Sequence, residues 1–288
     1  MFYSPLRYPG GKNKLSKFIS KVCIDNDIKG HYVEPYAGGA SVALYLLLED
    51  KVDKITINDF DRSIYAFWHS VLRNTKKLCD LIENTEINIE NWQKAKNIQK
   101  NKSKENLLDL GFSTFFLNRT NFSGIINAGV IGGPGQNGKY KIDCRFNKKE
   151  LIKRIKLIAK HKKQIKLYNL DALKLIKKIE KESDNNQTIF YFDPPYYLKA
   201  SSLYMNYYKN NQHKEVAEAI KNIRNINWIV SYDNTLEIEK IYNWISSKFI
   251  KKYSFNHSAY RAKEGNEILF FSNSLKNLDL RNILNRDL

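Results

Sequence analysis

The feature that most constrains this chain is a short hydrophobic strand that stops at two consecutive prolines. Residues 188–192 read Thr-Ile-Phe-Tyr-Phe, the β-branched and aromatic residues typical of a buried strand. Asp193, Pro194, Pro195 and Tyr196 follow at once. Asp193 and Pro194 each precede a proline, which favours extended backbone, and the prolines have no N–H. The sequence therefore predicts a stiff corner that presents a carboxylate, main-chain carbonyls and an aromatic ring.

Such a corner suits an amino group on a flat base. The Asp193 carboxylate and the Pro194 carbonyl can accept two N–H bonds, and the Tyr196 ring offers a face for stacking. The simpler interpretation is an ordinary strand end, with a proline-rich turn and an aspartate that caps the next helix. The rest of the chain favours the first interpretation.

Two glycine turns lie nearer the N-terminus. Residues 5–12 hold two prolines and two glycines and end in Lys12, so they cannot form a helix. Their N–H groups and the Lys12 ammonium can contact a carboxylate or a phosphate. Residues 32–36 then form a predicted strand, residues 37–40 read Ala-Gly-Gly-Ala, and residues 41–48 form a predicted apolar helix. A strand, a glycine turn and a helix begin a nucleotide-type α/β unit.

An acidic residue follows the next predicted strand, residues 54–57. Asp59 lies about twenty residues past the glycines, where dinucleotide-binding folds hold a ribose diol. It can also serve as the N-cap of a helix that starts near Asp61, and the two roles are compatible.

The middle of the chain has a different pattern. Residues 64–117 follow the apolar period of helices, with three polar breaks. Residues 118–145 are rich in Gly, Asn and Thr, which predicts loops and a hairpin with an extended piece at residues 139–142. The glycines at 133–138 match dinucleotide and phosphate-loop patterns in spacing only, because no strand-to-helix junction surrounds them. A basic helix is predicted at residues 148–162.

Alternation of strands and helices resumes in the second half. We predict helices ending near Glu180, Ile223 and Trp244, and a mobile flap around residues 204–208. The last two strands have no long helix between them, so they form an antiparallel pair. The predicted strands are residues 164–168, 188–192, 228–233, 249–255 and 267–271. The fold class is α/β, with a mainly helical insertion.

Charge indicates a polyanionic partner. The chain has 48 Lys and Arg against 30 Asp and Glu, a net charge of +18, which favours nucleic acid before membrane. A solvated lysine-rich surface explains part of this excess. Cys23, Cys79 and Cys144 show neither metal spacing nor a disulfide framework, so we expect no metal and a cytoplasmic location. No run is apolar enough to span a bilayer, and no signal peptide is expected.

The motifs and their order resemble the Dam-type DNA adenine-N6 methyltransferases, the α-ordered D12 class. The blocks that carry this resemblance are residues 8–12 (Tyr-Pro-Gly-Gly-Lys), 34–39, 57–59, 118–124 and 193–196. It covers nearly the whole chain. It implies a Rossmann-like sheet that uses S-adenosylmethionine, formed by residues 1–62 and 163–288. It also implies an inserted target-recognition domain, residues 63–162, for double-stranded DNA.

The resemblance assigns residues to three roles. The catalytic residues are Asp193, Pro194, Pro195 and Tyr196. The cofactor-binding residues are Tyr8, Lys12, Glu34, Tyr36, Ala37, Gly38, Gly39, Asp59, Asp171 and Asp193. Residues proposed to contact DNA, in the loop and the basic helix, are Arg119, Asn121, Phe122, Ser123, Gly124, Asn127, Tyr140, Lys153 and Lys156. Members that read GATC have an arginine where residues 125–127 read Ile-Ile-Asn, so the recognition sequence stays open.

Three other functions share parts of this pattern. An N4-cytosine methyltransferase uses the same amine chemistry, but that group more often has serine in place of Asp193. A non-catalytic basic DNA-binding module would not need Lys12, Asp59, Asp193 and Tyr196 together. An RNA methyltransferase has no support from an RNA-binding module. We expect a monomer or a weak dimer, and a cognate restriction endonuclease is left open as a partner.

Overall fold

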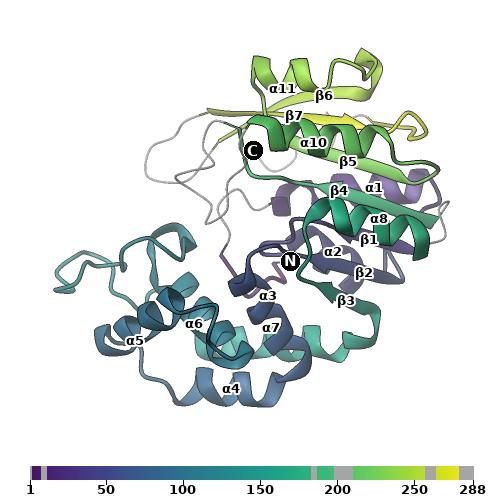
Figure 1. Ribbon diagram of the computed structural model, residues 1–288. Coiled ribbons are helices and arrows are strands. Elements are labelled where there is room, and N and C mark those ends of the chain that lie inside the picture. The colour runs from purple at the N-terminus through teal and green to yellow at the C-terminus, as the bar shows by residue number, and fades with distance from the viewer. Residues whose placement is uncertain (1, 8–11, 183–186, 198–209, 257–263, 279–288) are drawn as a thin grey trace.

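A computed structural model describes residues 2–7, 12–182, 187–197, 210–256 and 264–278 (Figure 1). Tyr8 and the flap predicted around residues 204–208 lie outside the described residues.

A single seven-stranded sheet organises the fold, in the order β3-β2-β1-β4-β5-β7-β6. The strands β1 to β5 are parallel, and β7 is antiparallel to both β5 and β6. The predicted antiparallel closing pair is thus confirmed. The strands are β1 His31–Glu34, β2 Lys54–Asn58, β3 Ile165–Tyr168, β4 Thr188–Phe192, β5 Asn227–Asp233, β6 Ile250–Asn256 and β7 Glu264–Phe271.

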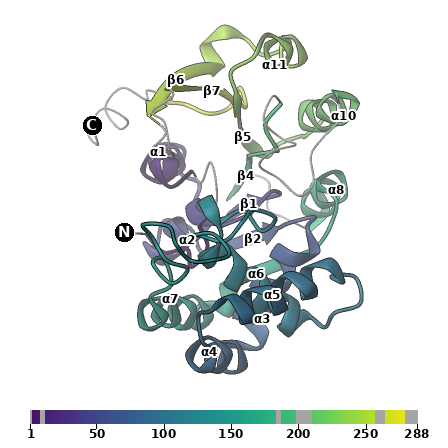
Figure 2. The same cartoon turned by 90° about the vertical axis from the view of Figure 1, so that its left-hand side faces the viewer.

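Helices cover both faces of the sheet (Figure 2). Side chains alternate along each strand, so Tyr191 and Leu269 pack on the face that holds α1 and α2, whereas Phe190 and Ile268 pack on the opposite face. The helices of the first face are α1 Ser16–Asp25 and α2 Ser41–Leu48, preceded by the short helix η1 Lys12–Leu15. Those of the opposite face are α8 Ala172–Glu182, α10 Asn210–Lys221 and α11 Leu236–Ile241.

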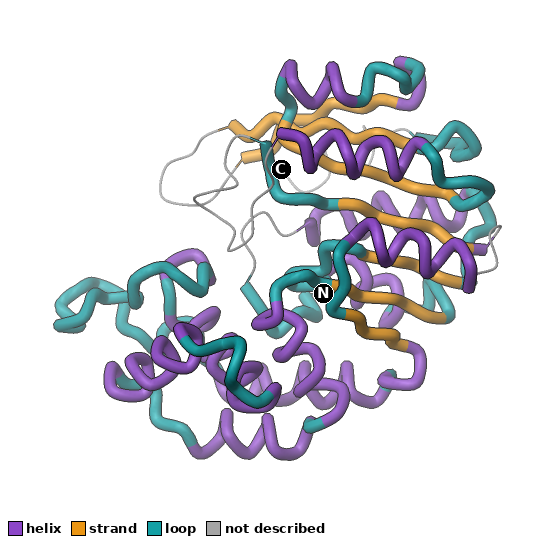
Figure 3. The backbone as a smooth tube through the Cα atoms, in the orientation of Figure 1, coloured by secondary structure: helices purple, strands orange, loops and turns teal. Residues whose placement is uncertain are grey.

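The helical insertion lies between β2 and β3, beside the β3 edge of the sheet (Figure 3). Phe67 and Phe115 stack with ring centroids 5.8 Å apart, and Phe115 also contacts Phe146. These rings belong to the same buried cluster as Phe18 of α1, so the insertion and the sheet share one hydrophobic core. Its helices are α3 Arg62–Arg73, α4 Thr75–Asn84, α5 Ile89–Lys100, α6 Leu107–Thr120 and α7 Lys148–Lys160.

The extended piece predicted at residues 139–142 is wrong, because this segment forms bends and a turn and no strand. The Gln136 side chain takes the place of a strand partner. Its Nε2 donates to the carbonyls of Ile131 at 2.8 Å and Gly133 at 2.7 Å, and its Oε1 accepts from the Ile142 N–H at 2.8 Å. Between residues 118 and 145, all of them described, the one β-bridge joins Asn121 and Val130.

Candidate active site

The candidate site lies where the strand order reverses. β1 and β4 are neighbours in the sheet, and the chain continues from them in opposite directions across it. In open α/β sheets, ligands bind outside the carboxyl ends of strands at such a switch point. Glu34 ends β1, Asp59 follows β2 and Asp193 follows β4, so three carboxylates gather at this edge.

One oxygen of Asp193 is held by the protein. Ser231 Oγ donates to Asp193 Oδ1 at 2.7 Å, and Lys12 Nζ lies 3.4 Å from the same oxygen. The Tyr191 hydroxyl lies 2.9 Å from Ser231 Oγ, and this hydrogen bond helps to orient the serine hydroxyl. No hydrogen bond from the described residues reaches Asp193 Oδ2, and the side chain keeps 22% of its surface exposed. This second oxygen is therefore placed to accept a hydrogen bond from a ligand.

Lys12 is the buried cation of the site. Its Nζ donates to the Tyr196 hydroxyl at 2.9 Å, forms an ion pair with Glu267 and lies 4.9 Å from the centroid of the Tyr196 ring. Tyr196 is itself buried, and its hydroxyl donates to Glu267. Pro194 is buried and Pro195 is half-buried. The corner predicted from the sequence is thus packed against η1 and β7.

Two opposing effects set the charge of these groups. Burial alone would lower the pKa of Lys12, but the carboxylates of Asp193 and Glu267 outweigh it and raise that pKa. Burial raises the pKa of Asp193 to about 6; Glu267 adds to the rise, whereas Lys12 and the Ser231 hydrogen bond oppose it. Asp193 therefore takes up a proton at a higher pH than an ordinary aspartate does.

Asp59 holds the glycine turn. Its Oδ2 accepts from the Gly38 N–H at 2.9 Å and its Oδ1 accepts from the Asp61 N–H at 2.9 Å. Gly38 has φ +45°, a left-handed conformation that favours glycine. Burial and the neighbouring Asp61 raise the pKa of Asp59 to about 7. The alternative role of Asp59 as a helix cap is wrong, because Asp61 caps α3 by accepting from the Ser63 N–H at 2.8 Å.

The other predicted cofactor residues lie around this turn or end a neighbouring strand. Glu34 is buried, and its Oε1 accepts from the Tyr32 hydroxyl at 2.9 Å and from the Ala43 N–H at 3.0 Å. Burial raises the pKa of Glu34 to about 8. Tyr36 is half-buried, whereas Ala37, Gly38 and Gly39 are buried. Asp171 accepts from the Leu173 N–H at 2.9 Å, at the start of α8.

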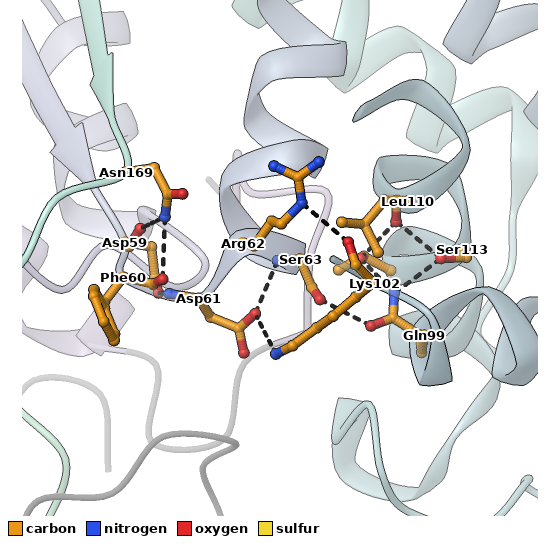
Figure 4. Close-up of polar contacts among 11 residues, drawn as sticks. Asp59, Phe60, Asp61, Arg62, Ser63, Gln99, Lys102, Leu110, Ser113 and Asn169 are labelled. Atoms are coloured by element: carbon orange, nitrogen blue, oxygen red, sulfur yellow. Dashed lines mark hydrogen bonds and ion pairs between the residues drawn. The ribbon is translucent and has the colours of Figure 1, made fainter. Parts of the chain in front are cut away.

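Phe60 was missed by the sequence analysis. It directly follows Asp59, and its side chain is 62% exposed. The Asn169 amide donates to the main-chain carbonyls of Asp59 and Phe60, which fixes the backbone here, and the Phe60 ring points away from this network (Figure 4). The available signal was an aromatic residue directly after the acid at a strand end.

Figure 4 also shows how the strand end joins the insertion. Lys102 Nζ lies 3.4 Å from Asp61 Oδ1, and the Arg62 guanidinium donates to the Lys102 carbonyl. Ser63 Oγ donates to Gln99 Oε1 at 2.8 Å, and Gln99 in turn reaches Ser113 and Thr114 of α6. A polar network therefore runs from the residues after β2 to the helix that ends at the predicted recognition loop.

Asn121 is a buried structural residue. The prediction that it contacts DNA bases is therefore corrected. The residue is fully buried. Its Oδ1 accepts from Trp92 Nε1 at 2.7 Å, and its Nδ2 donates to the carbonyls of Ile125 at 3.0 Å and Ile126 at 2.8 Å. The side-chain amide is thus bonded to Trp92 of α5 and to carbonyls of the loop, which leaves it buried and turned away from any base edge.

The neighbouring residues turn outward. Phe122 is 50% exposed, and Ser123 has φ +54°. Gly124 has φ +77°, and a Cβ there would lie 2.3 Å from the Arg7 carbonyl, so only glycine fits. Exposed side chains elsewhere in the predicted DNA-contacting set are Asn127, Tyr140, Lys153 and Lys156.

Arg119 belongs to a group of arginines with Arg7, Arg145 and Arg154. Burial and then the charge of Arg7 lower the pKa of Arg119 to about 9, and Arg154 and Arg145 add to this effect. The buried Nε of Arg119 has no hydrogen-bond partner among the described residues. Arg7 is anchored by its N–H, which donates to Asn118 Oδ1 at 2.7 Å. Because the positive charges of these arginines repel one another, the group is suited to bind an anion.

The sheet order and the carboxylate corner at the switch point define an α/β protein with a ligand site at the carboxyl ends of its strands. Residues 8–259 match the family model for the D12 class N6 adenine-specific DNA methyltransferases, and the chain belongs to this family. It is a DNA (adenine-N6)-methyltransferase that uses S-adenosylmethionine. No helix in the part of the chain that the structure describes is long and apolar enough to cross a membrane.

Two individual proteins are also similar to this chain. The chain is 25% identical to the Type II methyltransferase M.MjaIII of Methanocaldococcus jannaschii over 220 residues, which are 71% of this chain and 73% of that protein. A solved O-methyltransferase from Bacillus cereus in complex with SAH aligns over 89% of this chain and 80% of its own, with 10% identity and a TM-score of 0.35.

Proposed function

We propose that this enzyme methylates N6 of an adenine that is flipped out of duplex DNA, and that Asp193 Oδ2 and the Pro194 carbonyl hold its amino group. The observation that carries this proposal is the asymmetry of Asp193. Its Oδ1 is held by Ser231 and Lys12, whereas no hydrogen bond from the described residues reaches Oδ2. An exocyclic amine is a weak nucleophile because its lone pair is delocalised into the ring. Two acceptors on its N–H groups favour a pyramidal nitrogen and stabilise the positive charge that develops there.

The residues at the switch point fit S-adenosylmethionine. The Asp59 carboxylate and the exposed Phe60 ring suit a ribose diol and a flat base, and the acidic edge suits a cationic ligand. We propose that the turn at residues 37–39 and Asp59 hold the nucleoside part, with Lys12, Glu34, Tyr36 and Asp171 around it. S-adenosylmethionine supplies an activated methyl group when it is bound. The role of the protein is to align that group with the amine, and alignment provides much of the acceleration.

The duplex must release the base before Asp193 can reach it. Unstacking costs about a few kcal/mol, which contacts in the pocket offset. The exposed Phe122, at the tip of a tight turn, is proposed to approach the stack, with Ser123, Asn127 and Tyr140 nearby in sequence. Arg119 and its neighbouring arginines are proposed to contact phosphates. Tyr196 is proposed to stack on the base after a rearrangement of its buried ring.

The oligomeric state, the cellular location and a partner protein are proposed from the charge of the chain and from its relative. The net charge of +18 opposes self-association, so the enzyme acts as a monomer or a weak dimer. It acts on DNA in the cytoplasm. The relative named as a Type II methyltransferase supports a cognate restriction endonuclease as a partner.

Methylation in a methylase-free host tests the proposed function. DNA from cells that express the wild-type protein should carry N6-methyladenine at one short sequence. Asp193→Ala should abolish the mark while S-adenosylmethionine binding, measured by calorimetry, stays largely intact. A mark on N4 of cytosine, or normal activity of Asp193→Ala, would refute the proposal.

A further inference from the structure

Glu267 is a buried carboxylate in the candidate site, and the sequence analysis assigns it no role. It is only 2% exposed and lies on β7, where it pairs with Asp233 of β5 and Tyr253 of β6. Directly paired residues of an antiparallel sheet project from the same face. The sheet therefore fixes where Glu267 lies relative to the end of β5 and the middle of β6.

Both oxygens of Glu267 have partners. Its Oε1 accepts from the Tyr196 hydroxyl and pairs with Lys12 Nζ, and its Oε2 accepts from the Tyr253 hydroxyl. Lys12 and Tyr196 are also joined to each other at 2.9 Å. Three side chains, from η1, β6 and the corner after β4, thus meet at one carboxylate on β7.

Lys12 lies between two carboxylates, Asp193 at 3.4 Å and Glu267 in closer contact. A lysine side chain is flexible and carries three rotatable donors, so the single long contact with Asp193 does not fix the ammonium. The stronger partner, Glu267, determines where Nζ lies. A buried ammonium also needs a paired charge to stay ionised.

We propose that Glu267 is a positioning residue for methyl transfer: it anchors Lys12 Nζ and the Tyr196 hydroxyl, so that Asp193 Oδ1 stays engaged and Oδ2 faces the target amine. This inference rests on the proposed role of Asp193. Glu267 acts through Lys12 and Tyr196 and contacts no reacting atom.

The charge of Glu267 gives the proposal a distinctive readout. Asp193 is surrounded by Lys12, Glu267, Glu34, Tyr191 and Ser231, and the phenol of Tyr253 lies beyond Glu267. Among these, Glu267 raises the pKa of Asp193 and Lys12 lowers it. Glu267→Gln keeps the size of the side chain and removes the negative charge, so the pKa of Asp193 should fall. The acidic limb of the rate profile should then move to lower pH.

The experiment compares wild type, Glu267→Gln, Tyr253→Phe and Glu239→Gln. Steady-state methylation of unmethylated plasmid DNA, with labelled S-adenosylmethionine, is followed from about pH 5 to about pH 9. Glu239 is the matched control, because it forms an exposed ion pair with Lys252 at 2.7 Å on the far side of β6 from the corner. Glu239→Gln should behave as wild type.

Glu267→Gln should lower kcat by about 10²-fold, the effect of misplacing a reacting group by about 1 Å. The KM for S-adenosylmethionine should change much less, and the acidic limb should move to lower pH. Tyr253→Phe keeps both charges, so it should lower kcat by about threefold to tenfold without moving the limb.

A Glu267→Gln enzyme with wild-type kcat, or with a reduced kcat and an unmoved acidic limb, would overturn the proposal. If that variant does not fold, an unchanged kcat in Tyr253→Phe would overturn it instead. Asp193→Ala separates this result from the parent proposal. If Asp193→Ala stays active, the site assignment fails; if it is inactive while Glu267→Gln is normal, only the positioning role fails.

Discussion

Ser231 Oγ donates to Asp193 Oδ1 across 2.7 Å, from the middle of β5 to the corner after β4. Tyr191 and Ile229 are paired residues of β4 and β5, and Ser231 lies two residues further on the same face as Ile229. The carboxylate is thus aligned by the register of the sheet, before any substrate arrives.

Ser231→Ala should therefore raise the pKa of Asp193 above about 6, because the hydrogen bond that this change removes favours the ionised form. The acidic limb of kcat should move to higher pH, opposite to the shift expected for Glu267→Gln. At neutral pH the rate should fall about fivefold, corresponding to about 1 kcal/mol. The pH–rate profile measures both effects. Ser272→Ala is the control, since Ser272 is also buried, directly after β7, but accepts from the Trp228 N–H. A limb that stays in place in Ser231→Ala would contradict this expectation.

The carboxyl group of Glu34 makes the free energy of unfolding depend on pH. Its pKa is raised from 4.5 to about 8 in the folded state, so the folded protein holds a proton that the unfolded chain releases. Stability from this group is greatest below about pH 4.5 and falls as the pH rises towards 8. Glu34→Gln keeps the Oε1 acceptor for Tyr32 and Ala43 and removes the charge. At pH 8.5 it should melt a few degrees higher than wild type, at about 2–4 °C for each kcal/mol. Thermal unfolding across this pH range, with Glu49→Gln as the control, tests the claim; equal melting temperatures at pH 8.5 would disprove it.

Alanine variants of Asn121 and Asn127 should separate effects on protein stability from effects on DNA sequence recognition. Asn121→Ala leaves the buried Trp92 N–H and two carbonyls without partners, which should cost about 1–3 kcal/mol of stability. Asn127 is exposed, so Asn127→Ala should change stability by less than about 0.5 kcal/mol and alter which sequences are methylated. Denaturant unfolding and methylation sequencing of both variants give the comparison. Stable Asn121→Ala protein with altered site choice would reverse the assignment.

The exposed lysines of α7 should contribute affinity without sequence information. Lys153→Ala with Lys156→Ala should weaken binding to target and scrambled duplexes equally. The slope of log K against log salt should fall by about 1 for each phosphate that the variant no longer neutralises. Affinities at several salt concentrations measure this. Lys174→Ala, in α8 on the opposite face of the sheet, is the matched control. A change in site choice in the double variant, with no change in slope, would be incompatible with phosphate binding by these lysines.

Local patterns in the sequence predicted most of the fold. The strand at residues 188–192 and the helix at residues 41–48 have the predicted bounds, because apolar period and flanking turns determine both. The predicted polar breaks separate the helices of the insertion. Residues 139–142 were predicted wrongly, since a glutamine side chain supplies the hydrogen bonds that a strand would have made.

The site was predictable only in part. Asp193 and Lys12 stand in recognisable motifs, but Glu267 lies 255 residues from Lys12 and has no local signature. The burial of Asn121 depends on Trp92 from another helix, which sequence spacing does not reveal. Partners that come from separate strands and helices are determined by the tertiary fold.

The aromatic core that α1, α3 and α6 hold in common limits how such an enzyme can be re-engineered. Phe18, Phe67 and Phe115 lie in one cluster, so no plane of weak contacts separates the insertion from the sheet. Transplanting residues 63–162 into a related scaffold would divide this buried cluster and leave unfilled volume on both sides. New sequence preferences are better sought in short exchanges of the surface turn around Phe122, whose replacement leaves those rings untouched.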